Sequence, residues 1–239
     1  MFSAAMQTRV LTINISQLLL TVALSLGVSL LFPAKAQSKG YAALALVSLR
    51  DEPPVGAIKT LDGYLLVWNR PDFHFTVSIK GKDIKPLNDT EHVFFNVDGL
   101  VFQVQLASIT EFAPGAKDKK LDDRSILVAH RDWESKFIED LLHSKIKVQS
   151  FNARLSNGSD ALMWQFDLPE GFNSDAKKQL YLTVVSKDYV LLFNGVATAA
   201  ISEEVVRRFL LDTIATLKIS PTPIDVKKLS ESIRKGGAP

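Results

Sequence analysis

The sequence predicts an α+β fold in which an antiparallel β-sheet packs with two main α-helices. Three observations predict this class. Several segments alternate between apolar and polar residues, tight-turn signals join neighbouring segments, and two longer segments have the periodicity of amphipathic helices. The expected order is four strands and a helix, followed by four strands and a helix. Strands that are adjacent in sequence and joined by tight turns pair antiparallel, so the pattern excludes a parallel doubly wound sheet.

The first half of the chain contains the clearest strand signals. Segments 73–79 and 100–106 each carry an apolar residue at every second position, which gives one apolar and one polar face. Asp98 and Gly99 stand just before the second of these segments, and this dipeptide tolerates the positive φ angles of a tight turn. The pattern therefore predicts a hairpin that turns at Asp98-Gly99.

The first helix is expected over residues 123–143. Asp122 or Asp123 can cap the free backbone amides of its first turn, where the helix dipole also favours negative charge. The strands expected after this helix are 162–168, 180–185 and 189–196. Asn157-Gly158 marks a turn before the first of these strands.

The end of the predicted domain is a hairpin followed by a helix. Strands 180–185 and 189–196 are separated by a short turn, and Ser202 then introduces a helix over 203–217 with Glu203 and Glu204 in its first turn. This hairpin and helix resemble the closing elements of the PsbP-like α/β sandwich, named for a photosystem II extrinsic subunit. The resemblance covers roughly 40 of the 203 residues after position 36. It implies a non-catalytic and often extracytoplasmic accessory role, and it transfers no functional residue.

The N-terminal residues predict a secretory signal peptide over 1–36. Arg9 and Lys35 are the only charged residues in this segment, and an apolar stretch runs from 18 to 32 before the small-x-small triplet Ala34-Lys35-Ala36. We therefore expect cleavage after Ala36 and a secreted or periplasmic protein. The alternative is an uncleaved leader that anchors the chain in a membrane.

The remaining boundaries follow from prolines and composition. Residues 37–56 are expected to be a linker because Pro53 and Pro54 break regular structure, and residues 57–219 are expected to form a single α+β domain. Residues 220–239 are expected to be a flexible tail. Its basic residues give it a small positive charge that permits weak contact with an anionic membrane; they are Lys227, Lys228, Arg234 and Lys235.

The charge balance and the residue types exclude several functions. Beyond residue 36 the chain carries 26 basic and 26 acidic residues, so nucleic acid is not an expected partner. The chain has no cysteine, which excludes thiolate zinc sites, redox dithiols and cysteine nucleophiles. It also contains no phosphate-binding glycine loop, nucleophile elbow or zinc-binding His-Glu-x-x-His motif. We therefore predict no cofactor and no metal.

The candidate site residues are His130 and Glu134 on the first predicted helix. They stand at i and i+4 in the apolar stripe of that helix, where apolar residues would be expected. One interpretation is catalytic: the carboxylate orients the imidazole as a general base beneath a pocket. The other is structural, with the pair hydrogen-bonded to each other or to nearby backbone, and this second interpretation is favoured because buried polar groups need partners.

The other histidines are expected at the surface. His74 stands on the polar face of its strand, and His92 follows the charged residue Glu91. His143 has the spacing to pair with Glu139 on the exposed face of the helix.

The sequence as a whole favours a secreted or periplasmic binding or accessory domain without catalytic activity. Its partner would be an envelope protein or a small ligand. The alternative is an extracytoplasmic hydrolase that uses the pair His130 and Glu134.

Overall fold

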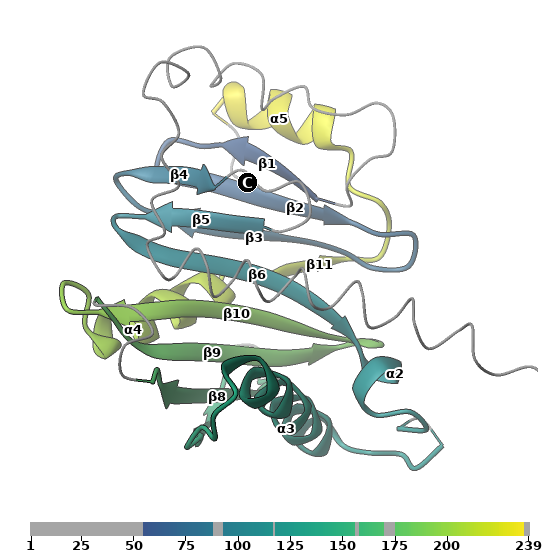
Figure 1. Ribbon diagram of the computed structural model, residues 1–239. Helices are drawn as coiled ribbons and strands as arrows, with labels where there is room; N and C mark the ends of the chain where they lie inside the picture. The colour runs from purple at the N-terminus through teal and green to yellow at the C-terminus, as the bar shows by residue number, and fades with distance from the viewer. Residues whose placement is uncertain (1–54, 88–92, 117, 156–157, 170–174, 237–239) are drawn as a thin grey trace, which may run out of the picture. The chain divides into compact units, whose positions relative to one another are not determined.

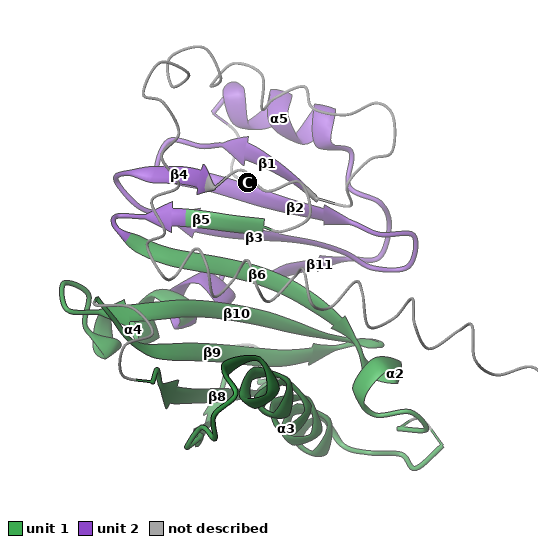
Figure 2. Ribbon diagram, in the orientation of Figure 1, with its two compact units in different colours: residues 1–28, 87–95, 100–210 green, residues 29–86, 96–99, 211–239 purple. Residues whose placement is uncertain are grey.

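The computed structural model describes residues 55–87, 93–116, 118–155, 158–169 and 175–236 (Figure 1). The predicted leader and almost all of the predicted linker lie outside these residues. Residue contacts divide the chain into two compact units, where the sequence suggested one domain over 57–219 (Figure 2). Unit 1 comprises 87–95 and 100–210 of the described parts, and unit 2 comprises residues up to 86, 96–99 and the stretch from 211 onward.

Unit 1 is built on an antiparallel sheet. Its strands follow the order β5-β6-β10-β9-β8-β7. Their bounds are β5 (Val93–Val97), β6 (Leu100–Ser108), β7 (Gln149–Arg154), β8 (Asp160–Asp167), β9 (Ala176–Ser186) and β10 (Tyr189–Thr198). Strand β4 (Ile84–Leu87) falls almost entirely in unit 2. The turn into β6 is the predicted one, because Asp98 and Gly99 have φ angles of 52° and 91°.

Three helices accompany this sheet. They are α2 (Ile109–Phe112), α3 (Asp123–Leu142) and α4 (Glu203–Ile214). Trp164 of β8 lies in the cluster beneath α3, whereas its neighbour Met163 contacts Arg207 of α4. Successive residues of a strand point to opposite faces, so α3 and α4 cover opposite faces of the sheet. Gly195 lets α4 approach closely, because a Cβ at this position would lie 2.9 Å from Val206 Cγ1.

Unit 2 contains a smaller antiparallel sheet with the order β1-β2-β3-β11. Its strands are β1 (Val55–Lys59), β2 (Gly63–Asn69), β3 (His74–Lys80) and β11 (Lys218–Ser220), and helix α5 spans Val226–Arg234. Leu229 and Ile233 of α5 pack with Ile224 against a small core of Ile58, Leu65 and Val67. The apolar face of α5 is therefore occupied by β1 and β2.

The fold class is α+β with antiparallel sheets, as predicted, and the structure differs from the expected order in three places. Among the described residues, six strands precede α3 instead of four, and the short helix α2 comes between them and α3. Helix α4 ends at Ile214, not at 217, because the chain turns at Thr216, whose Oγ1 accepts a 2.8 Å hydrogen bond from Ser78 N. The expected flexible tail contains β11's last residue and α5, fixed by two hydrogen bonds between the Asn69 side chain and the Ile224 backbone.

The expectation that His74 is solvated is wrong. Its side chain is only 4% exposed, and Phe75, Thr76 and Val77 beside it are also buried. Strand β3 lies between β2 and β11 with both faces covered at this end, so alternation does not mark a solvent-facing side here. His92 lies outside the described residues. No helix in the described part of the chain is both long and apolar enough to cross a membrane.

We predict that Asn69→Ala loosens α5. The substitution removes the hydrogen bonds of 2.8 and 2.9 Å that hold Ile224, and two such bonds contribute about 1–2 kcal/mol. Amide hydrogen exchange across Val226–Arg234 should therefore accelerate by about tenfold. Thr60→Ala removes only an exposed hydrogen bond to Asp62 and should leave this exchange unchanged. Exchange of α5 at the rate of an unfolded peptide in the unaltered protein would contradict the anchoring.

Candidate functional site

Helix α3 positions both candidate residues, and its ends are capped. Asp122 accepts a 2.7 Å hydrogen bond from Ser125 N at the start, as the sequence predicted. His143 ends the helix in the left-handed conformation with a φ of 50°, and its backbone N–H donates to the Glu139 carbonyl. The Glu139 carboxylate binds Lys145, so the expected side-chain pair with His143 is replaced by a different one.

His130 is buried among aromatic rings. Its side chain is 1% exposed, the ring of Phe112 meets it edge-on at 5.0 Å, and the ring of Trp133 lies 6.0 Å away. Burial lowers the pKa of His130 to about 4, so the imidazole is neutral at pH 7. Its Nδ1 atom is buried without a hydrogen-bond partner, so this nitrogen forms no bond to Glu134.

Glu134 lies one helical turn later and also faces the sheet. It is 7% exposed, and burial raises its pKa to about 7. Burial and the negative charge of Glu134 together raise the pKa of Tyr181 well above its ordinary value. Tyr181 stacks on Trp164 with ring centroids 3.9 Å apart. The carboxyl group therefore lies near Tyr181 of β9, in a buried environment that disfavours its charged form.

A surface depression of about 480 Å³ opens on the outer side of α3 and is lined mainly by charged residues. Its lining residues are Arg131, Asp132, Ser135, Lys136, Glu139, Asp140, Lys145 and Val148. His130 and Glu134 are not among them. A catalytic role requires His130 and Glu134 to border an accessible cavity. The depression lies beside these residues on α3 and includes neither of them.

Two ion pairs join charged residues that line the depression. Arg131 binds Asp132 at 2.5 Å and Lys145 binds Glu139 at 2.6 Å. The hydrogen bond from Lys145 lowers the pKa of Glu139, and the same bond raises the pKa of Lys145. Both groups therefore stay charged across the neutral pH range.

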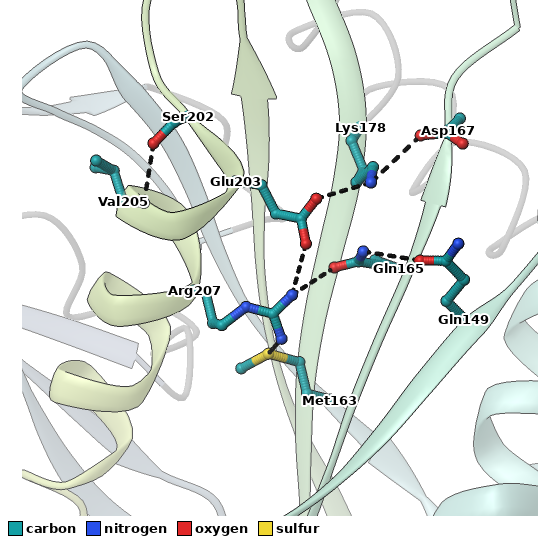
Figure 3. A network of polar contacts seen from close by, with 9 residues as sticks. All are labelled: Gln149, Met163, Gln165, Asp167, Lys178, Ser202, Glu203, Val205 and Arg207. Atoms are coloured by element: carbon teal, nitrogen blue, oxygen red, sulfur yellow. Dashed lines mark hydrogen bonds and ion pairs between the residues drawn. The ribbon is translucent and has the colours of Figure 1, made fainter.

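A second polar cluster lies on the opposite face of the sheet, beneath α4 (Figure 3). Glu203 accepts hydrogen bonds from Lys178 at 2.7 Å and from Arg207 at 2.6 Å. Arg207 also donates to Gln165 and Met163, and its guanidinium lies 4.9 Å from the centre of the Phe151 ring. The hydrogen bond from Lys178, with those from Gln165 and Arg207, lowers the pKa of Glu203 to about 2.

Sequence reasoning missed this cluster. The spacing of Glu203 and Arg207, four residues apart on a predicted helix, is a signal that could have identified one of its ion pairs. The contributions of Lys178 and Gln165 depend on the register of β8 and β9, which places Gln165 opposite Leu180 and Asp167 opposite Lys178. Within the described residues, no three His, Cys, Asp or Glu side chains gather in a way that could hold a metal ion.

The similarity of this chain to known proteins is slight. No family model matches the sequence, and no curated protein matches it. Among solved structures, the chain is similar to cyanobacterial PsbP (CyanoP) from Synechocystis sp. PCC 6803, with 10% sequence identity and a TM-score of 0.39. The match covers 72% of this chain and 96% of that chain. At this level of similarity the match transfers neither a function nor a functional residue to this chain.

We predict that Glu134→Gln stabilises the protein increasingly as the pH rises. The folded-state pKa of Glu134 is about 7 against an ordinary value of 4.5, so ionisation costs stability from pH 4.5 upward and the cost is complete above pH 7. The gain from the neutral amide should be near zero at pH 4 and about 3 kcal/mol at pH 8. Urea unfolding at a series of pH values measures this difference.

The matched control for that measurement is Glu139→Gln on the same helix. The pKa of Glu139 is lowered in the folded state, so its charge favours folding above pH 4.5, and its removal should be neutral or destabilising there. A Glu134→Gln effect that is constant from pH 4 to pH 8 would contradict the burial of an ionisable carboxyl group.

We also predict that Glu203→Gln lowers the melting temperature at pH 7. The pKa of Glu203 is about 2 in the folded state and 4.5 ordinarily, so its ionised form favours folding above pH 4.5, and this contribution is lost as the pH falls through 2. Glu204→Gln is the control, because Glu204 forms only an exposed pair with Arg208 at 3.4 Å. Equal losses for the two variants at pH 7 would show that the cluster beneath α4 has no special role.

Proposed function

We propose that this chain is an extracytoplasmic domain that binds a protein of the cell envelope and assists it without catalysing a reaction. The proposal places binding at the charged depression on α3. Two grounds support the proposal. The expected leader indicates an extracytoplasmic location, and in unit 1 the accessible ionisable groups are charged whereas His130 and Glu134 are buried.

The observation that carries the proposal is the state of the charges in the depression. A general acid or base works best when its pKa lies near the working pH. Here the ion pair moves the pKa of Glu139 down and that of Lys145 up, away from neutrality. Fixed charges of both signs suit electrostatic recognition of a complementary protein surface, because they set its orientation and raise the rate of association.

The alternative function is a hydrolase that uses His130 and Glu134. The pKa of Glu134, about 7, favours this alternative because it matches the requirement for a general acid or base. Access argues against it. The two side chains are 1% and 7% exposed, and neither lines the depression, so a substrate would have no path to them unless α3 moved.

We also propose a weak contact of helix α5 with an anionic membrane. Its basic residues Lys227, Lys228 and Arg234 are exposed, whereas Leu229 and Ile233 pack on the sheet of unit 2. Contact with an anionic membrane would therefore be electrostatic only. Each basic residue near the surface contributes about 1 kcal/mol, so the contact would be weak and sensitive to salt.

We predict that a photo-reactive amino acid at Lys136 cross-links the chain to a specific envelope protein in cells that express it. Lys136 is exposed and lines the depression. The same probe at Glu204, which is exposed on α4 outside the depression, should give no such adduct. Mass spectrometry identifies the cross-linked protein, and charge reversal at Lys145 should reduce the yield of the adduct.

An assay for hydrolysis tests the alternative function. Purified protein is assayed with ester, peptide, phosphoester and glycoside substrates, and no hydrolysis that depends on Glu134 is expected. Turnover that is lost in Glu134→Gln and retained in Glu139→Gln would overturn the proposal in favour of the hydrolase. Equal cross-linking from Lys136 and Glu204 would overturn the assignment of binding to the depression.

A further inference from the structure

In the part of the chain that the structure describes, strand β7 of unit 1 has no strand paired with its outer edge. It is the last strand of its sheet and pairs with β8 alone among the described strands. The two strands differ sharply in exposure: residues 161–166 of β8 are all buried, whereas every residue of β7 except Ala153 is exposed. An open sheet edge presents backbone groups that can pair with another strand.

The hydrogen bonds of the β7–β8 turn show which backbone groups face outward. Leu155 N donates to Ser159 O at 2.9 Å, and Leu155 O accepts from Gly158 N at 2.9 Å, so both polar groups of Leu155 point toward β8. Backbone groups alternate between the two sides along an antiparallel strand. Those of Gln149, Phe151 and Ala153 therefore face β8, and those of Ser150, Asn152 and Arg154 face the open edge.

The edge lacks the features that usually prevent strand pairing. Residues 149–154 contain no proline and no lysine, and Arg154 at the end is the only charged residue. The arginines beside the strand are neutralised within the unit: Arg131 pairs with Asp132, and Arg207 pairs with Glu203. Lys147, just before β7, and Arg154 at its end are exposed basic residues. An antiparallel partner strand centred on Phe151 would not place these two residues directly opposite each other.

We propose that β7 pairs antiparallel with β7 of a second copy of this chain, centred on Phe151. In this register, Ser150 and Asn152 of the partner subunit form a hydrogen-bonded pair, as do their symmetry equivalents. The two Phe151 side chains, each 42% exposed in one copy, face each other at the closely spaced position of the ladder. Arg154 falls opposite Val148 of the partner subunit, so no like charges are opposed.

A second copy is chosen as the occupant because the residues of β7 complement themselves in this register and no like charges are directly opposed. The same residues complement themselves, with polar side chains paired beside a central aromatic pair, as an isologous dimer interface requires. Pairing joins two unit 1 sheets and removes both open edges. The proposal does not depend on the function proposed above, because it rests on the backbone edge of β7 and not on the charges of the depression, although Val148 belongs to both.

Sedimentation of the full chain tests the proposal. The unaltered protein is expected to form a dimer. Asn152→Pro removes an N–H that faces the open edge, and it should weaken the dimer at least about tenfold without breaking the β7–β8 ladder. Asn152→Thr removes the same side chain and keeps the N–H, so it should remain dimeric. A monomer for the unaltered protein, or equal association of both variants, would overturn the proposal.

Disulfide trapping provides a second test that does not need the proline variant to fold. The chain has no cysteine, so a single introduced thiol reports on its own position. Two Phe151→Cys residues would have Cα atoms about 4.5 Å apart, within reach of a disulfide, whereas two Asn152→Cys residues are offset by two positions and lie beyond it. Rapid oxidation of the first variant alone is expected. Equal oxidation of both variants would contradict the register.

Discussion

Helix α3 lies against β8 and β9, with Tyr181 and Trp164 stacked at 3.9 Å in the same core, and the chemistry of unit 1 depends on this contact. The helix can bury an apolar face only by burying His130 and Glu134 with it, because both occupy that face. Each responds by favouring its neutral form: the pKa of His130 falls and that of Glu134 rises. The two groups with the greatest potential for acid–base chemistry are thereby removed from solvent.

On the opposite face of the sheet, beneath α4, the charged form of a glutamate is favoured and not disfavoured. There the ionised form of Glu203 is favoured, because Lys178 and Arg207 donate hydrogen bonds to it beneath α4. The outer side of α3 is likewise fixed in its charged state by Lys145 and Glu139. The accessible groups keep their charge, whereas burial disfavours the charged forms of His130 and Glu134. The proposed binding function rests on this contrast.

The sequence predicted the local elements well and the tertiary environment less well. Alternation and turn chemistry were sufficient for the hairpin at Asp98-Gly99, and the cap at Asp122 and the inward direction of His130 and Glu134 were also predicted. The burial of His74 was missed because alternation within a strand does not show whether both faces are covered. The fixed position of α5 was not predicted, because its anchor, Asn69, lies 155 residues away in the sequence. The cluster around Glu203 depends on the register of β8 and β9, which no local pattern specifies.

The central claim is that Glu134 is enclosed beneath α3 while the carboxylates of the neighbouring depression are accessible. Carbodiimide coupling of an amine to carboxyl groups of the native protein, mapped by mass spectrometry, tests it most directly. The account predicts that Asp132, whose side chain is 63% exposed, is modified and that Glu134 is protected until the protein is unfolded. Modification of Glu134 in the native protein at the rate of Asp132 would contradict the account and would return the pair His130 and Glu134 to consideration as an active site.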